Sequence, residues 1–91
     1  MLMLAQIDLS RANLALFDEY EAKVLALLEQ YGARLEERLR STDGTAELHL
    51  LYFPDAEALA AFRCDPMRSS VQHIWEQSGA SATLKEVARL E

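Results

Sequence analysis

The chain has 91 residues, which is enough for one hydrophobic core and excludes a multidomain enzyme. Hydrophobic residues make up 51% and charged residues 26%, with only three glycines and two prolines, so the composition excludes a disordered or low-complexity protein. The formal net charge of −6 opposes attraction to nucleic-acid phosphates and to anionic lipid, and we expect neither nucleic acid nor a membrane as a partner.

Cysteine usage and the first residues favour a reducing compartment. Cys64 is the single cysteine, so the chain cannot form an internal disulfide. The apolar opening at residues 1–5 is too short for a membrane span and lacks the basic flank of a signal peptide. We therefore expect a cytoplasmic protein.

The first third of the chain predicts a strand followed by a helix. Residues 1–9 form a short apolar run that predicts a first strand. Residues 13–30 predict an amphipathic helix, with Asn13 as the N-cap and Gly32 as the left-handed stop. Its apolar side carries Phe17, Tyr20, Val24, Leu27, Leu28 and Tyr31.

A hairpin follows. Asp43-Gly44 stands between two alternating runs, at residues 33–41 and 45–53, and this dipeptide is typical of a two-residue type I′ turn. Pro54 ends the second of these strands because it cannot donate to a ladder, and Asp55 is placed to cap the next helix.

The last third predicts a broken helix and a strand. The helix pattern that begins after Asp55 restarts at Asp65-Pro66 and ends near Gly79. Residues 82–90 alternate weakly and include Thr83 and Val87, which favours a fourth strand, and a terminal helix from Leu84 is the alternative.

This order is β-α-β-β-α-β, the ferredoxin-like α+β arrangement, for a single domain at residues 1–91. Right-handed crossovers place both helices on one face of a four-stranded antiparallel sheet, with strand order 4-1-3-2.

The hairpin register divides the sheet residues between two faces. A turn at Asp43-Gly44 places Leu39 opposite Leu48 and Arg38 opposite His49. We assign the helices to the face with Leu35, Leu39, Leu48, Leu50 and Tyr52. The open face then holds Arg34, Glu36, Arg38, Arg40, Glu47, His49, Leu51 and Phe53, and the first strand adds either Leu2, Leu4, Gln6 and Asp8 or the opposite set. An open face of mixed apolar and charged side chains favours a homodimer through the sheet, and complete solvation is the alternative.

The stretch at residues 46–66 resembles the dimeric α+β barrel superfamily. It ends a strand in Phe53-Pro54, caps a helix with Asp55, and places Phe62 before Asp65-Pro66. Residues 18–35 are also similar to the first helix, and its entry into the second strand, of small bacterial families of unassigned function, which are related to antibiotic biosynthesis monooxygenase-type domains. The resemblance implies the ferredoxin-like fold and face-to-face pairing of two sheets. It does not imply one reaction, because relatives include cofactor-free monooxygenases, isomerases and proteins without known activity.

The candidate site residues lie on the face that we assign to the partner. His49 is a candidate general base or ligand-binding group, and the alternative is a structural histidine bonded to Glu36 or Asp8. Arg38 and Arg34 have the fork geometry that binds a carboxylate, and ion pairs are the alternative. The full set of ligand-binding candidates is Arg38, His49, Leu51, Phe53 and Asp8.

Familiar cofactor motifs are missing from the sequence. The two histidines are His49 and His73, no second cysteine accompanies Cys64, and no metal-ligand spacing results. No glycine-rich phosphate loop is present, so we expect no cofactor and no metal.

Two functions remain open. The first is a homodimer that binds a small molecule or serves a non-catalytic role. The second is a cofactor-independent monooxygenase or isomerase that acts on a small aromatic or enolisable metabolite through His49 and Arg38.

Overall fold

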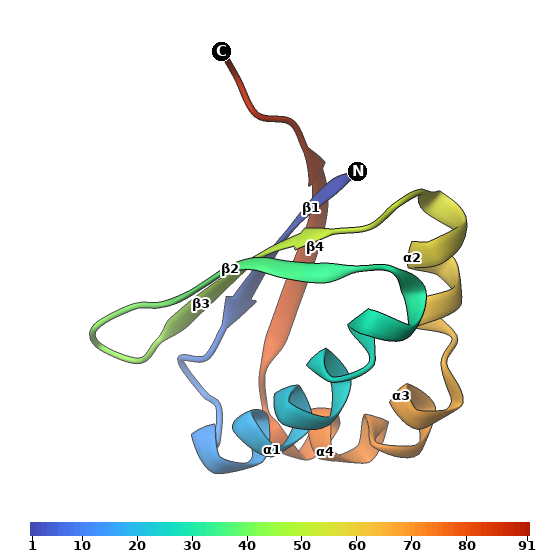
Figure 1. Cartoon of the computed structure of the whole chain (residues 1–91). Coiled ribbons are helices and arrows are strands. Elements are labelled where there is room, and N and C mark those ends of the chain that lie inside the picture. Colours follow the sequence, from blue (N-terminus) through green and yellow to red (C-terminus); the bar gives the residue numbers. More distant parts are fainter.

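A computed structural model of residues 1–91 shows a four-stranded antiparallel sheet with its helices packed on one face (Figure 1). In chain order the elements are β1 (Leu2–Asp8), α1 (Leu14–Leu25), the 3-10 helix η1 (Leu28–Tyr31), β2 (Arg34–Arg40), β3 (Ala46–Tyr52), α2 (Ala56–Arg63), α3 (Pro66–Ser70), α4 (Gln72–Ser78) and β4 (Ser81–Val87). The strand order β2-β3-β1-β4 confirms the predicted ferredoxin-like topology. None of the helices has the length and apolar composition needed to cross a bilayer.

The helices begin where the sequence signals predict. The side chains of Asn13 and Asp55 each accept a hydrogen bond from a first-turn backbone N–H, at 3.1 and 2.8 Å, and Asp65 does the same for α3. The helix predicted at residues 13–30 is shorter, because α1 ends at Leu25 and η1 continues to Gly32 at φ 66°. The second helix is broken into three segments rather than two, with a further break at Val71.

The C-terminal segment is a strand. Residues Leu2 to Asp8 of β1 pair along their whole length with Val87 to Ser81 of β4. This confirms the predicted fourth strand and excludes the alternative helix from Leu84. Because β4 lies at one edge of the sheet, one side of this strand has no neighbour.

The β2–β3 hairpin keeps the predicted register with a different turn. Gly44 has a φ of 77°, but no other residue type has a positive φ, so the loop is not the type I′ turn that we predicted. Ser41 donates its backbone N–H to Ala46 at 2.9 Å across a four-residue loop. Inside the loop, hydrogen bonds from Thr45 and Ser41 lower the pKa of Asp43 to about 2.

The assignment of the two faces was wrong, and the structure inverts it for β3. Phe53, Glu47 and His49 are 0%, 2% and 3% exposed beneath the helices, whereas Leu39 and Leu48 are 58% and 38% exposed on the open face. Arg38 and Arg40 therefore point to the helix side, together with Leu51. We placed the ionic side chains toward the partner because burying charge is costly, but here the ions neutralise one another under the helices.

A bulge in β2 explains why the predicted faces of Leu35 and Arg34 were nevertheless correct. The pairing shifts between Leu35 and Glu37, so that Leu35 lies opposite Leu51 and Arg34 opposite Tyr52. The extra residue moves Leu35 to the helix side, where it packs against the core. Without the bulge, a strict period of two would leave Leu35 on the same face as Leu39.

Candidate functional site

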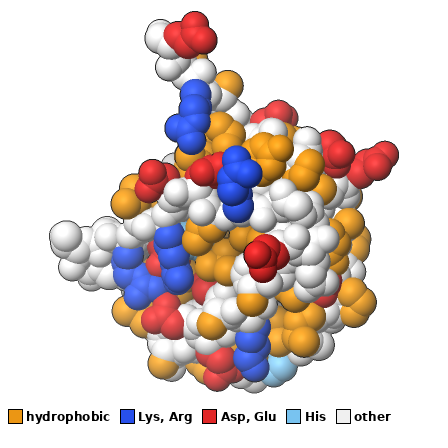
Figure 2. Space-filling view, viewed as in Figure 1, with side chains coloured by type: hydrophobic (Ala, Val, Ile, Leu, Met, Phe, Trp, Pro, Cys, Tyr) orange, Lys and Arg blue, Asp and Glu red, His pale blue; other side chains and the backbone are white.

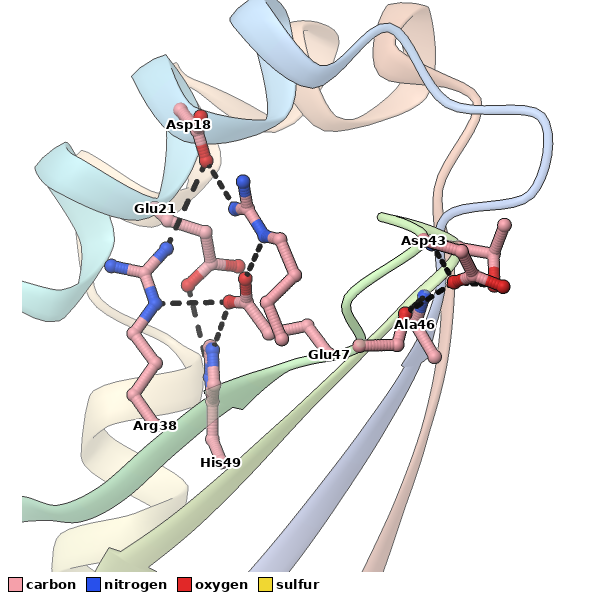
Figure 3. A network of polar contacts seen from close by, with 10 residues as sticks. Asp18, Glu21, Arg38, Asp43, Ala46, Glu47 and His49 are labelled. Atoms are coloured by element: carbon pink, nitrogen blue, oxygen red, sulfur yellow. Dashed lines mark hydrogen bonds and ion pairs between the residues drawn. The ribbon is translucent and has the colours of Figure 1, made fainter.

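A network of charges, built on the buried Glu47 carboxylate and the exposed side chains of Arg38, Arg40 and Asp18, connects β2, β3 and α1 (Figure 3). The Glu47 carboxylate accepts hydrogen bonds from Arg38 Nε at 3.0 Å, Arg40 Nε at 2.8 Å and His49 Nε2 at 2.5 Å. Arg40 also bonds Asp18 of α1 at 2.6 Å. Figure 2 shows one group of basic side chains beside the hairpin, next to acidic ones. The network ties the hairpin to the first helix.

The surroundings of Glu47 and His49 fix their charges. Burial alone would raise the pKa of Glu47, but the hydrogen bonds from His49, Arg40 and Arg38 hold that pKa below its usual value. Burial lowers the pKa of His49, and this outweighs the attraction of Glu47. At neutral pH the imidazole is therefore uncharged beside a carboxylate. Its proton lies on Nε2, because Glu47 has no proton to donate, and Nδ1 keeps a free lone pair.

That lone pair faces a second buried carboxyl group. Glu21 of α1 is 5% exposed and forms no hydrogen bond, and its Oε2 lies 3.9 Å from His49 Nδ1. Burial and the charge of Glu47 raise the pKa of Glu21 to about 7, against the attraction of Arg38 and Arg68. Glu21 is the one carboxyl group of this cluster that forms no hydrogen bond to the protein, and it is half-protonated near neutral pH.

Glu21 and His49 line a cavity of about 330 Å³ between the sheet and the helices. Most of its lining side chains are hydrophobic, and two aromatic pairs form its walls. Tyr20 and Trp75 have ring centroids 5.2 Å apart, and Phe53 and Phe62 have centroids 5.5 Å apart. An apolar pocket with a few convergent polar groups is typical of a small-molecule site.

The cavity opens between β4 and the C-terminal helices. Its exposed lining residues are Thr83 and Leu84 of β4, Arg63 of α2 and Gln72 of α4, whereas Glu21 and the residues of β3 are buried at the inner end. The open side of the cavity exists because the helices leave β4 uncovered. A ligand would enter past β4 and meet Glu21 and His49 last.

The structure brings together most of the predicted site residues. His49, Leu51 and Phe53 line the cavity, and Arg38 lies beside it through its bond to Glu47. Asp8 does not join them, since it is exposed on the opposite face and accepts a hydrogen bond from Ser10 N at 2.9 Å. Arg34 is also on the open side, where its guanidinium lies 4.2 Å from the centroid of the Tyr52 ring.

Sequence reasoning did not select Glu21, Arg68 or Trp75 as site residues. For Glu21 the signal is present, because residues 17, 20, 21 and 24 share one side of α1 and an acid stands in the middle of that apolar stripe. No such pattern marks Arg68, because its position at the cavity depends on the breaks between α2, α3 and α4. No group of three or more His, Cys, Asp or Glu side chains is arranged to hold a metal ion.

Several solved structures share the fold of this chain, although the sequence comparisons find no relative. No family model and no curated protein matches the sequence. Among solved structures, SnoaB, a cofactor-independent oxygenase from Streptomyces nogalater, is similar with a TM-score of 0.72 and 13% identity, over 98% of this chain and 94% of SnoaB. A NIPSNAP domain protein from Burkholderia xenovorans has a TM-score of 0.61 and 20% identity, over 97% and 95% of the two chains.

A third similar structure, a dimeric ferredoxin-like protein of unknown function from Jannaschia, has a TM-score of 0.65 and 16% identity, over 96% of this chain and all of the other. The chain has the fold of the antibiotic biosynthesis monooxygenase and NIPSNAP proteins. This confirms the fold that the resemblance at residues 46–66 implied. Identities this low establish the shared fold and no shared reaction.

Proposed function

We propose that this protein binds a small, largely aromatic molecule in the cavity between the sheet and the helices. The observation that carries the proposal is Glu21, a buried carboxyl group without a hydrogen-bond partner that faces an open cavity. Its oxygens are accessible from the cavity, so a bound hydrogen-bond donor can reach them. Arg38 and the other charges serve to hold Glu47 and His49 in place.

The inner end of the cavity selects for a hydrogen-bond donor. His49 Nδ1 and the Glu21 carboxylate both accept hydrogen bonds when Glu21 is ionised. The gap of 3.9 Å between them is too long for a direct hydrogen bond, which leaves both groups available to a ligand hydroxyl. The aromatic rings of Tyr20, Trp75 and Phe62 would stack on the body of the ligand.

Binding of p-cresol and toluene tests this selection, because the two molecules differ in one hydroxyl group. The single Trp75 lines the cavity, so its fluorescence reports occupancy. We expect p-cresol to bind more tightly than toluene, and Glu21→Leu to remove this difference while toluene binding persists. Glu19→Leu, an exposed change on the same helix, serves as the control. If neither compound binds, or if the variant keeps the preference, the proposed site is wrong.

We further propose that two copies pair through the open sheet face. Seven apolar side chains lie there in contact with solvent: Leu2, Leu4, Leu39, Leu48, Leu50, Tyr52 and Val87. An apolar sheet face of this kind is rare on a monomer, and an interface of roughly 800 Å² per protomer would cover it. The Jannaschia protein of the same fold is dimeric, which supports pairing of two copies. Light scattering should give twice the 10.3 kDa mass of the chain, and a monomer at micromolar concentration would overturn the proposal.

A second candidate function is a cofactor-independent oxygenase, and the pKa of Glu21 favours it. A carboxyl group with a pKa of about 7 is suited to remove a proton from an enolisable substrate at neutral pH. The enolate would itself reduce dioxygen, so that one oxygen atom enters the ring as a ketone and the other leaves as water.

Oxygen uptake with anthrone, an enolisable tricyclic ketone, tests this activity. We expect uptake by the chelator-treated protein and its loss in Glu21→Gln, which keeps the shape of the side chain but cannot take up the proton. Uptake that is unchanged in the variant would exclude Glu21 as the base, and no uptake by the unmodified protein would leave the binding function alone.

A further inference from the structure

Arg68 is a half-buried cation at the cavity that forms no ion pair, unlike Arg38 and Arg40, whereas Arg63 also forms none but is exposed. The ion pairs of the chain involve Arg34, Arg38, Arg40 and His49, and none involves Arg68. Arg68 is nevertheless half-buried, and it lines the same cavity as Glu21 and His49. The carboxyl groups of Glu21 and Asp65 attract Arg68 only from beyond ion-pair distance, so its guanidinium has hydrogen-bonding capacity left for an anion from outside the chain.

The guanidinium of Arg68 is held in one orientation by aromatic neighbours. Its Cζ lies 4.8 Å from the centroid of the Phe62 ring, and its Nη2 donates to the Tyr20 hydroxyl at 3.4 Å. Stacking on a ring fixes the plane of a guanidinium and leaves its edge N–H groups free for a second acceptor.

The backbone beneath Arg68 is also fixed. Asp65 caps the helix that carries Arg68 by accepting from Met67 N at 2.8 Å, and the Tyr31 hydroxyl donates to the other oxygen of Asp65. The cation is therefore preorganised before any ligand arrives, which reduces the entropy that binding would cost.

We propose that Arg68 binds the carboxylate of the ligand, and that the ligand is a small aromatic acid with a hydroxyl group at its other end. This inference rests on the proposed small-molecule site. Arg68 of α3 is half-buried, whereas Glu21 and His49 are buried, so one ligand can meet a cation with its carboxylate and two hydrogen-bond acceptors with its hydroxyl group. A planar carboxylate matches the guanidinium fork in two hydrogen bonds. The chain as a whole has a net charge of −6 and repels anions, so only a local cation would make an acid the preferred ligand.

Calorimetry with 4-hydroxyphenylacetate and 4-hydroxyphenylacetamide tests this role, because the two probes share ring and hydroxyl and differ in charge. We expect the unmodified protein to bind the acid at least tenfold more tightly than the amide. Arg68→Gln should bind both probes with the affinity of the amide, and Arg68→Lys should keep part of the preference. Arg11→Gln, at an exposed position, changes the net charge by the same amount and should keep the full preference for the acid.

A measurement on the unmodified protein tests the same role without depending on the folding of the Arg68 variants. Raising the salt concentration should weaken binding of the acid and leave binding of the amide unchanged. Equal affinity for the two probes, or a preference that survives Arg68→Gln, would overturn the role of Arg68 and leave the cavity as a binding site. Failure of both probes to bind the unmodified protein would count against the binding site itself.

Discussion

The two faces of the sheet do not follow the usual rule that apolar side chains are buried and charged side chains are exposed. The face under the helices carries Glu47 and His49, together with the guanidinium groups of Arg38 and Arg40. The face open to solvent carries Leu39 and Leu48 side by side. The buried face is thus the more charged one, and the exposed face is the more apolar one.

This difference indicates what each face is for. Charges under a helical layer are costly unless they are paired, so a complete network around Glu47 with Glu21 left unpaired beside it points to a site rather than to packing alone. Leucines on an open face gain stability only when something covers them. The two proposals therefore place chemistry and association on opposite faces, whereas the sequence alone led us to expect both on one face.

The largest expected effects come from placing the same charge on each face. Phe53→Asp puts a carboxylate at a fully buried position and should cost about 5 kcal/mol or more, which is enough to unfold a small domain. Leu48→Asp, at a position 38% exposed on the open face, should keep the fold and yield a monomer. Circular dichroism and light scattering separate the two results. A folded Phe53→Asp monomer would restore our original assignment of the faces.

The pH dependence of stability should sharpen the contrast around Glu21. Its pKa is raised from 4.5 to about 7, so its protonated form stabilises the folded state below pH 4.5, and this contribution is lost as the pH rises through 7. The free energy of unfolding, relative to Glu21→Gln, should fall by on the order of 3 kcal/mol over this range.

His49 acts in the opposite direction, which is why the variant is needed as a reference. Its pKa is lowered from 6.5 by burial, so it destabilises the fold as the pH falls below 6.5. This effect is present in both proteins, so their difference reports Glu21 together with its coupling to His49 across 3.9 Å. Urea unfolding at several pH values measures the difference in unfolding free energy between the two proteins. If this difference stays constant from pH 4 to pH 8, Glu21 is not buried as described.

A smaller effect should follow from removing one charge of the network. Glu47→Gln leaves the hydrogen bonds of Arg38 and Arg40 without a full counter-charge and should cost about 2 kcal/mol, because both arginines can rehydrate in part. Glu37→Gln, on the open side of the neighbouring strand, should stay within about 0.5 kcal/mol. Thermal unfolding compares the two, and equal losses would argue against a network specific to the helix side.

The sequence was sufficient to predict the fold, because local signals marked almost every element. Asn13, Asp55 and Asp65-Pro66 start helices, and the hairpin register from Arg38 to Arg40 follows from the alternation on either side of Asp43-Gly44. These signals act over a few residues, so tertiary packing does not need to be known.

The faces and the site could not be predicted in the same way. Both sides of β3 carry leucine and an aromatic residue, so the period of two gives two consistent solutions, and only the packing of α1 decides between them. The bulge at Glu36 leaves no mark in composition. The cavity depends on three helix segments meeting β3 and β4, which is information about distant parts of the chain. His49 was selected because a histidine titrates near neutral pH in most surroundings. Glu21 and Arg68 are unusual only because the fold buries them, and the sequence does not show this.

The smallest expected effect concerns Asp8, which we predicted as a ligand-binding residue. It lies opposite Ala46 and Ser81 on the open face, with the whole thickness of the sheet between its carboxylate and Glu21. Asp8→Asn should leave the affinity for p-cresol unchanged within error, whereas Glu21→Leu on the helix side removes the preference for the hydroxyl group. Both variants change one acidic residue, so charge alone cannot explain a difference between them. If Asp8→Asn weakened binding as strongly, the ligand would lie on the open face, and the division between the two faces would not hold.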